Sequence, residues 1–177
     1  MLLRRNMTGP MLKLNGRDEG ISVSLETKLS GADLPEKVLT SITNLFPNFP
    51  IDDDLLNPEL GNAKDQLIHS SNLSIDIFLQ QLHKQKILDT ALDSMSLNLD
   101  SEECYFYISR QAALSGKVSF IIPGEFPLGG TIKITLRGSN LKDWIEAATW
   151  HSGRDSMPRS INDERSMSKS GEASTWI

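Results

Sequence analysis

Several absences narrow the classes of protein to which this sequence can belong. The 177 residues contain one cysteine, which leaves no internal disulfide and no zinc site built from cysteines. No apolar run approaches the ~20 residues of a transmembrane helix, so no membrane contact is expected. The glycine-rich patterns that hold nucleotide phosphates and the H-E-x-x-H pattern of zinc hydrolases do not occur. The commonest nucleotide-binding and zinc-hydrolase classes are thereby excluded.

Basic residues are in the minority. The chain carries a formal net charge of −5, and residues 20–150 alone hold ten basic and seventeen acidic residues. No long-range positive field is expected, which argues against a generic, salt-driven nucleic-acid binder but leaves room for a local basic patch. The early arginines are not followed by an apolar segment of signal-peptide length, and a lone cysteine suits a reducing compartment. A cytoplasmic location is predicted.

Three regions differ in pattern. Residues 1–19 have no clear periodicity and carry turn-forming residues, which predicts a flexible N-terminal extension. Residues 20–150 alternate between strand and helix periodicities, which predicts a single domain. Residues 151–177 are rich in serine and arginine and poor in apolar side chains, which predicts a disordered C-terminal tail.

Hydrophobic periodicity predicts eight elements in the domain. Strands are expected at 21–28, 66–69, 104–108, 117–122 and 131–137. Helices are expected at 34–46 with Asp33 as N-cap, at 73–96 with Asn72 as cap, and at 141–148. The apolar stripe of the second helix changes phase along its length, so one straight helix on one sheet cannot bury all of it. A kink, a break or a second partner is therefore predicted near 83–86.

This order of elements predicts an α+β fold, a mostly antiparallel sheet with helices packed on one face. One sheet face is uniformly apolar: Val23, Leu25, Cys104, Phe106, Ile108, Val118, Phe120, Ile122, Ile132, Ile134 and Leu136. The other is polar, with two tyrosines and several cations: Ser24, Glu26, Lys28, Tyr105, Tyr107, Lys117, Ser119, Thr131, Lys133, Thr135 and Arg137. Three interpretations of the polar face stay open: an ordinary hydrated face, contact with a partner subunit, or RNA binding by stacking tyrosines and cations.

No catalytic or metal-binding group is predicted. Asp52, Asp53 and Asp54 are typical of a solvated turn, and the three histidines have no metal-ligand spacing. Asp89 and Asp93 lie one helical turn apart, as an acid–base pair would, but exposed acids of this kind usually serve solvation. Cys104 shares the apolar face and is interpreted as a small core residue.

The connection at 109–117 is more informative. Ala112, Ala113 and Leu114 predict a helical turn with Gly116 at its exit, bracketed by Arg110 and Lys117. Two interpretations stay open: a basic loop that presents Arg110, Gln111 and Lys117 to a ligand, or a connection whose alanines pack tightly on the sheet.

A series of segments between residues 86 and 145 resembles the archaeal uncharacterised protein family 0201. In chain order they are KILDTA (86–91), YFYI (105–108), RQAA (110–113), GKVSF (116–120), PLG (127–129), IKI (132–134) and LKDWI (141–145). The resemblance implies a fold similar to the large-subunit ribosomal protein that binds 5S ribosomal RNA, RNA binding, and often a dimer. It defines no catalytic residue. The chain departs from the family at Ser109-Arg110, where the family usually has Asn-Lys.

Together these observations predict a non-catalytic RNA-binding protein that recognises structured RNA, with no cofactor, metal or small-molecule substrate. The residues expected to contact phosphates are Lys84, Lys86, Arg110 and Lys117, those expected to stack on bases are Tyr105 and Tyr107, and Gln111 and Lys133 complete the set. The alternative is a protein-interaction or homodimerisation module, motivated by the second apolar stripe between Ile87 and Met95.

Overall fold

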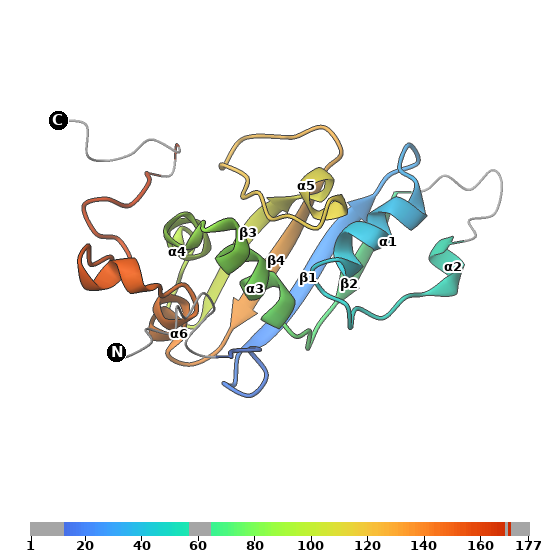
Figure 1. Ribbon diagram of the computed structural model, residues 1–177. Coiled ribbons are helices and arrows are strands. Elements are labelled where there is room, and N and C mark those ends of the chain that lie inside the picture. Colours follow the sequence, from blue (N-terminus) through green and yellow to red (C-terminus); the bar gives the residue numbers. More distant parts are fainter. Residues whose placement is uncertain (1–12, 57–64, 169, 171–177) are drawn as a thin grey trace, which may run out of the picture.

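A computed structural model describes residues 13–56, 65–168 and 170 (Figure 1). Its sheet contains β1 (Ser22–Leu29), β2 (Gln66–Ser70), β3 (Glu103–Ser109) and β4 (Thr131–Arg137) in the order β2-β1-β4-β3. Each neighbouring pair is antiparallel. The α+β class with an antiparallel sheet is therefore confirmed.

Helices cover the apolar face of this sheet. In Figure 1, α1 (Pro35–Thr43) and α3 (Asp76–Gln85) cross in front of the strands, and α4 (Leu88–Ser96) and α6 (Leu141–Ala148) lie to their left. Short helices form at Asp53–Leu56 (α2) and Arg110–Leu114 (α5), and a 3-10 helix at Ser152–Asp155. The ring of Phe78 is fully buried and lies 5.9 Å from the rings of both Phe46 and Phe106. These aromatic contacts join the helices to the sheet.

The period-two pattern assigned the faces of β1, β3 and β4 correctly, but not those of residues 117–122, which are not a strand of the sheet. Val23, Leu25 and Ile134 are buried under the helices, and the side chains between them point to the opposite side, here called the open face. Thr27 is the polar exception among the inward positions, and its hydroxyl donates a 2.6 Å hydrogen bond to the Thr131 carbonyl. This bond satisfies a hydroxyl that burial would otherwise leave without a partner.

The break predicted near 83–86 is also confirmed. Lys86 adopts a left-handed conformation (φ 56°) between α3 and α4, and the Ile87 N–H donates to the Leu82 carbonyl, which closes the first helix. The change of direction lets both stripes face the core, because Leu82 on α3 and Leu92 on α4 are each fully buried. The stripe from Ile87 to Met95 is thus covered by the chain itself, which removes the reason given for a dimer.

Three local predictions were wrong. Residues 117–122 do not form a strand, and only an isolated bridge joins Ile108 to Phe120. The Gln85 side chain accepts from the Val118 N–H and donates to the Val118 carbonyl, so these groups cannot continue a ladder with β3. Asp33 does not cap α1, whose N-cap is Leu34, but pairs with Arg110. Asn72 does not cap a helix either, since α3 begins only at Asp76.

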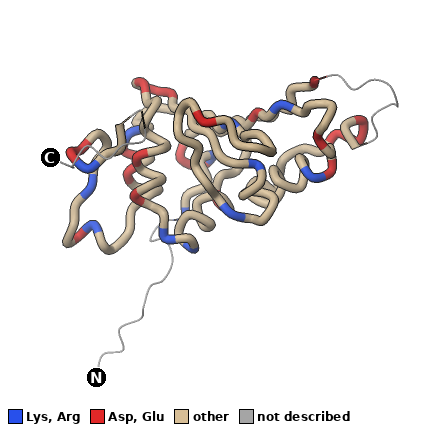
Figure 2. Tube along the Cα trace, turned by 90° about the horizontal axis from the view of Figure 1, so that it is seen from above, with Lys and Arg blue, Asp and Glu red and all other residues tan. Residues whose placement is uncertain are grey.

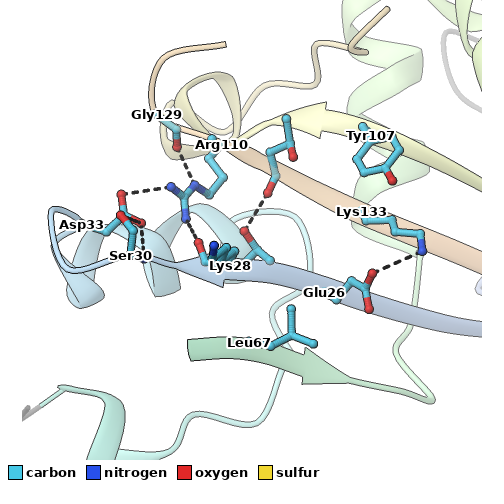
Figure 3. Close-up of a pocket in the computed structure, with 12 residues that line it drawn as sticks. Glu26, Lys28, Ser30, Asp33, Leu67, Tyr107, Arg110, Gly129 and Lys133 are labelled. Carbon is cyan, nitrogen blue, oxygen red and sulfur yellow. Dashed lines mark hydrogen bonds and ion pairs between the residues drawn. The ribbon is translucent and has the colours of Figure 1, made fainter. Parts of the chain in front are cut away.

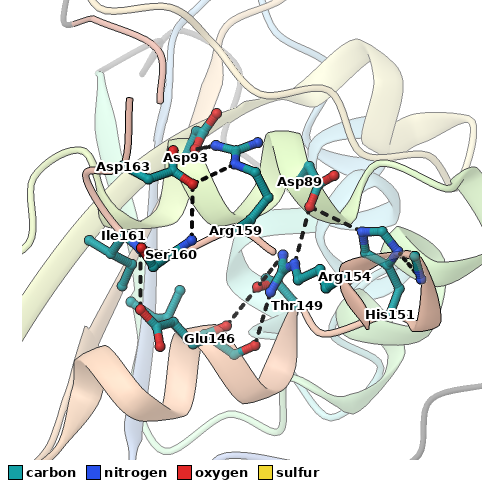
Figure 4. Close-up of polar contacts among 12 residues, drawn as sticks. Asp89, Asp93, Glu146, Thr149, His151, Arg154, Arg159, Ser160, Ile161 and Asp163 are labelled. Atoms are coloured by element: carbon teal, nitrogen blue, oxygen red, sulfur yellow. Dashed lines mark hydrogen bonds and ion pairs between the residues drawn. The ribbon is translucent and has the colours of Figure 1, made fainter. Parts of the chain in front are cut away.

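The regions on either side of the domain are more ordered than predicted. The Asn15 carbonyl accepts from the Ile75 N–H, and Glu19 accepts a 3.3 Å bond from the Trp144 indole, so residues 13–19 pack on the domain. Residues 151–168 form a strap across α4 and α6, with Arg154 buried (Figure 4). Composition suggested disorder because it does not reveal the acids that these arginines meet. Residues 1–12, 169 and 171–177 lie outside the described residues.

Within the described ranges, no helix combines the length and the apolar character that crossing a membrane requires.

Candidate functional site

The open face carries a hollow of about 490 Å³ near the end of β1 and the start of β4 (Figure 3). We call it the polar hollow. Its walls include charged groups of both signs, an aromatic ring and a glycine pair, contributed by Glu26, Lys28, Leu67, Tyr107, Arg110, Gly129, Gly130, Thr131 and Lys133. Three of the predicted site residues, Tyr107, Arg110 and Lys133, therefore meet in one place.

Strand register explains this convergence. Tyr107 on β3 lies opposite Lys133 on β4, and Lys133 lies opposite Glu26 on β1. Because all three point to the open face, they form a row across the sheet. The next outward position on β1 is Lys28, which lies opposite Leu67 on β2.

The cations of the open face are paired with acids. Lys28 Nζ lies 2.8 Å from Asp65 and Lys133 Nζ lies 3.2 Å from Glu26. The hydrogen bond and the negative charge of Asp65 raise the pKa of Lys28 above its ordinary value. The Lys28–Asp65 pair is exposed and the Lys133–Glu26 pair is only half-buried, so neither adds much to stability and an anion in the hollow can replace either carboxylate at little cost. Both lysines remain candidate ligands for phosphate.

The two tyrosines differ in availability. Their ring centroids are 6.1 Å apart at an interplanar angle of 87°, an edge-to-face pair. Lys133 Nζ lies 5.1 Å from the Tyr105 ring centroid, so that half-buried ring already interacts with a cation. Tyr107 is 37% exposed and is the better stacking surface of the two.

Arg110 contradicts the prediction that it is presented to a ligand. Its side chain is only 8% exposed, and its three nitrogens donate to the Gly129 carbonyl, the Lys28 carbonyl and Asp33 at 2.5, 2.8 and 3.0 Å. Burial raises the pKa of Asp33, but hydrogen bonds from Ser30 and the Arg110 guanidinium outweigh this, so that pKa lies below its ordinary value. Arg110 is therefore a structural part of the floor of the hollow.

The other predicted residues lie outside the hollow. Gln111 is exposed on α5, next to Arg110 in the chain. Lys84 and Lys86 flank Gln85 in the chain. The Gln85 side chain hydrogen-bonds the Val118 backbone, which brings Lys117 close to these two lysines. Lys84, Lys86 and Lys117 are all exposed and have no ion-pair partner within the described ranges. They form a separate basic patch near the α3–α4 break.

A second hollow, which sequence reasoning missed, lies along the outer edge of β3, between that strand and the segment that follows Phe120. We call this space of about 510 Å³ the apolar hollow. Its walls are mainly Tyr105, Tyr107, Phe120, Ile122 and Phe126, with Asn98, Thr90 and Ser94 as polar members. Only the aromatic content of 104–108 and 118–126 hinted at it, because the sequence does not reveal that 120–126 runs beside β3.

The acids, histidines and cysteine considered from the sequence have structural partners or are exposed. Asp89 accepts from His151 at 3.1 Å and from Arg154 at 3.2 Å, and Asp93 pairs with Arg159 at 2.7 Å (Figure 4). Burial, and then the neighbouring His151, lower the pKa of His83. Asp52–Asp54 is exposed, and the described residues contain no cluster of three metal-ligating side chains.

Cys104 lies fully buried on the apolar face. Its burial raises the pKa of the thiol to about 12, which opposes any role as a nucleophile at neutral pH.

Charge on the whole chain is mixed. Figure 2 shows acidic and basic positions interspersed along the tube, with no continuous basic face over the described residues. Any anion-binding site must therefore be local.

No family model matches the sequence, but individual proteins do. The UPF0201 protein of Sulfurisphaera tokodaii is 32% identical over 133 residues, which cover 72% of this chain and 88% of that relative. The UPF0200/UPF0201 protein of Archaeoglobus fulgidus is 26% identical over 123 residues, and the match spans only 35% of its length.

Solved structures agree with these matches. The UPF0201 protein from Methanococcus jannaschii has a TM-score of 0.60 at 22% identity, covering 75% of this chain and 96% of that one. A further UPF0201 crystal structure has a TM-score of 0.58 at 25% identity, with 71% and 90% covered. They support the fold, whereas the expected likeness to the 5S RNA-binding ribosomal protein stays a prediction.

Proposed function

Because the chain belongs to the UPF0201 family, whose name assigns no activity, we propose a function from its own surface: it is a non-catalytic, cytoplasmic RNA-binding module. The RNA lies across the open face, with phosphates at Lys28 and Lys133 and a base against Tyr107. The observation that carries this proposal is the half-exposed Tyr107 ring beside Lys133 in the polar hollow.

The chemistry of the hollow supports an unpaired stretch of RNA. A base stacked on an aromatic side chain contributes ~1–3 kcal/mol whatever its identity, because every base presents a flat ring face. Such stacking needs a base outside a double helix, as in a loop or bulge of structured RNA. Phosphate replaces the carboxylates of Asp65 and Glu26 at the two lysines. It forms charge-assisted hydrogen bonds with both ammonium groups.

The acidic composition limits the electrostatic part of this binding. Two phosphate contacts on single-stranded RNA give a log–log dependence of affinity on salt with a slope of about −1.4. A slope several times steeper would indicate that other cations carry the binding, and the patch of Lys84, Lys86 and Lys117 would be the first to examine.

Fluorescence anisotropy with a labelled RNA hairpin, titrated at several salt concentrations, tests the proposal. Tyr107→Ala and the double variant Lys28→Ala/Lys133→Ala are each expected to weaken binding about tenfold, from the loss of one stacked base or two phosphate contacts. The matched control is Lys37→Ala/Lys142→Ala, which removes the same charge from exposed helix positions. Equal affinity for all four proteins would place the RNA site elsewhere, and no binding by the wild type would reject the function.

Phe126 and Leu128 favour a second candidate, a homodimerisation module. Both side chains lie in the connection between Phe120 and β4 and are 93% and 91% exposed. Apolar side chains this exposed often mark protein contacts, and a two-fold dimer would bury both copies of the connection together. Sedimentation of the wild type and of Phe126→Ser/Leu128→Ser tests it: a dimer that dissociates in the variant is expected, and a wild-type monomer at every concentration rejects it.

A further inference from the structure

The apolar hollow and the polar hollow are neighbours. Tyr107 and Thr131 line both of them, so the Tyr107 side chain stands between a space walled by charged groups and one walled by rings. This arrangement matches the two parts of a nucleotide, which is anionic at its phosphate and flat and largely apolar at its base.

The walls of the apolar hollow suit an uncharged ring with polar edges. Its aromatic lining comes from Tyr105, Phe106, Tyr107, Phe120 and Phe126. Among the described residues, the only charged wall residue is Glu125, which is exposed. The volume of about 510 Å³ lies within the ~300–1,000 Å³ range typical of small-molecule sites. A phosphate entering this space would lose water without gaining a cationic partner, because no lysine or arginine is among the described wall residues, so phosphate is not expected there.

Polar groups at one side give the hollow hydrogen-bonding capacity. The Asn98 side-chain nitrogen donates to the Tyr105 carbonyl at 3.2 Å, which fixes the amide and keeps its oxygen as an acceptor. Thr90 and Ser94 add hydroxyls from α4, and a hydroxyl both donates and accepts. Amide and hydroxyl groups of this kind bind the exocyclic and ring-nitrogen edges of a base.

We propose that the apolar hollow receives one unpaired nucleobase of the bound RNA, while the adjacent phosphate occupies the polar hollow. Tyr107 separates the two subsites and stacks on the inserted base. This inference rests on the proposed RNA-binding function and deepens it, since it identifies the ligand as a single-stranded nucleotide read through its ring. An apolar peptide would fill the same space without needing the lysines beside it.

The test compares two RNAs that have the same phosphates. One is a labelled oligo-uridine, and the other is an abasic oligoribonucleotide of the same length. The wild type is expected to bind the abasic RNA about tenfold more weakly, which is the loss of one stacked base. Phe126→Ala is expected to weaken binding of oligo-uridine and to leave the abasic RNA unaffected.

Leu128→Ala is the matched control, because Leu128 is as exposed as Phe126 in the same connection but does not line the hollow. Both variants should fold, since neither side chain is buried. Photo-crosslinking with 4-thiouridine is expected to label peptides that contain residues 105–107 or 120–126.

The outcomes separate the inference from the function on which it rests. Equal affinity for the two RNAs, with Lys28→Ala/Lys133→Ala still weakening both, overturns the base subsite and leaves the RNA-binding function standing. The base subsite is likewise overturned if Phe126→Ala and Leu128→Ala behave alike, or if the crosslinks map elsewhere. Failure of either RNA to bind rejects the function and the subsite together.

Discussion

Arg110 and Asp33 are 77 positions apart in the chain, and their side chains form a 3.0 Å ion pair that is almost closed to water. The same guanidinium also donates to the carbonyls of Lys28 at the end of β1 and Gly129 before β4. It lies so close to Gly130 that a Cβ at that position would overlap the guanidinium. One side chain thus holds together the chain segments that shape the polar hollow.

Replacing Arg110 by alanine is expected to destabilise the fold by about 3 kcal/mol, because it removes the cationic partner of the half-buried Asp33 carboxylate and the donors to the Gly129 and Lys28 carbonyls. Urea unfolding followed by circular dichroism measures this loss. Arg137→Ala is the control: its pair with Glu103 is exposed, so a change of ~1 kcal/mol or less is expected. Similar losses in the two variants would show that Arg110 is not structural.

Arg110 also shows where sequence reasoning ends. Period-two alternation assigned Tyr107 and Lys133 to the open face, because strand geometry fixes side-chain direction locally. The pairing of their strands depends on contacts between distant segments, as does the meeting of Arg110 with Asp33. Arg110 was therefore interpreted as a ligand contact, although in the fold its guanidinium is paired with the distant Asp33.

The strap over 151–168 depends on a second arginine. Arg159 lies between Asp93 at 2.7 Å and Asp163 at 2.8 Å, and all three side chains are less than a fifth exposed. Arg159→Ala leaves two acids facing each other and is expected to release the strap, with a loss of about 3 kcal/mol. Limited proteolysis should then cut within 151–168 much faster, whereas the exposed Arg165→Ala should resemble the wild type.

This strap explains why composition misjudged the segment. Serine and arginine are common in disordered chains because they bury little apolar surface. Here Ile161 supplies one buried apolar contact, and the arginines gain charged partners on α4. The acids at 89 and 93 were visible in the sequence, but nothing local linked them to residues 154 and 159.

Acid is expected to loosen the same strap. Burial by itself would raise the pKa of Asp163. Hydrogen bonds from Arg159, Ser160 and Ser166 outweigh this effect and lower the pKa to about 2, from an ordinary 3.8. A carboxyl whose folded pKa is depressed stabilises the fold above its ordinary pKa and stops doing so as pH falls through the folded value.

Stability should therefore fall between pH 3.8 and about 2, and Asp163→Asn should flatten that part of the profile. Urea midpoints measured across this range check the prediction, with the exposed Asp143→Asn as control. Asp93 opposes the trend slightly, because its burial raises its pKa and its ionisation therefore costs stability as pH rises. A profile that is unchanged in Asp163→Asn would contradict the assignment.

The α3–α4 break supplies a prediction of opposite sign. Lys86 holds a positive φ of 56°, which strains a residue with a Cβ and suits glycine. Lys86→Gly is expected to stabilise the protein by ~0.5–1 kcal/mol despite the flexibility of glycine in the unfolded chain. Lys84→Gly, two residues earlier in α3, should instead destabilise it by ~1 kcal/mol. Thermal unfolding of both variants decides, and equal shifts would show that no such strain exists.

Cys104 offers a probe of global stability that requires no substitution. Its thiol is fully buried between the sheet and the helices, and its pKa is raised to about 12, so the reactive thiolate does not form in the folded state. Labelling by a thiol-specific reagent should therefore proceed only through unfolding and should accelerate with urea in step with the global transition. Ser119→Cys, at an exposed position, should label at once and provides the reference rate. If wild-type Cys104 reacts as quickly as the thiol introduced at position 119 in native buffer, the apolar face of the sheet opens locally.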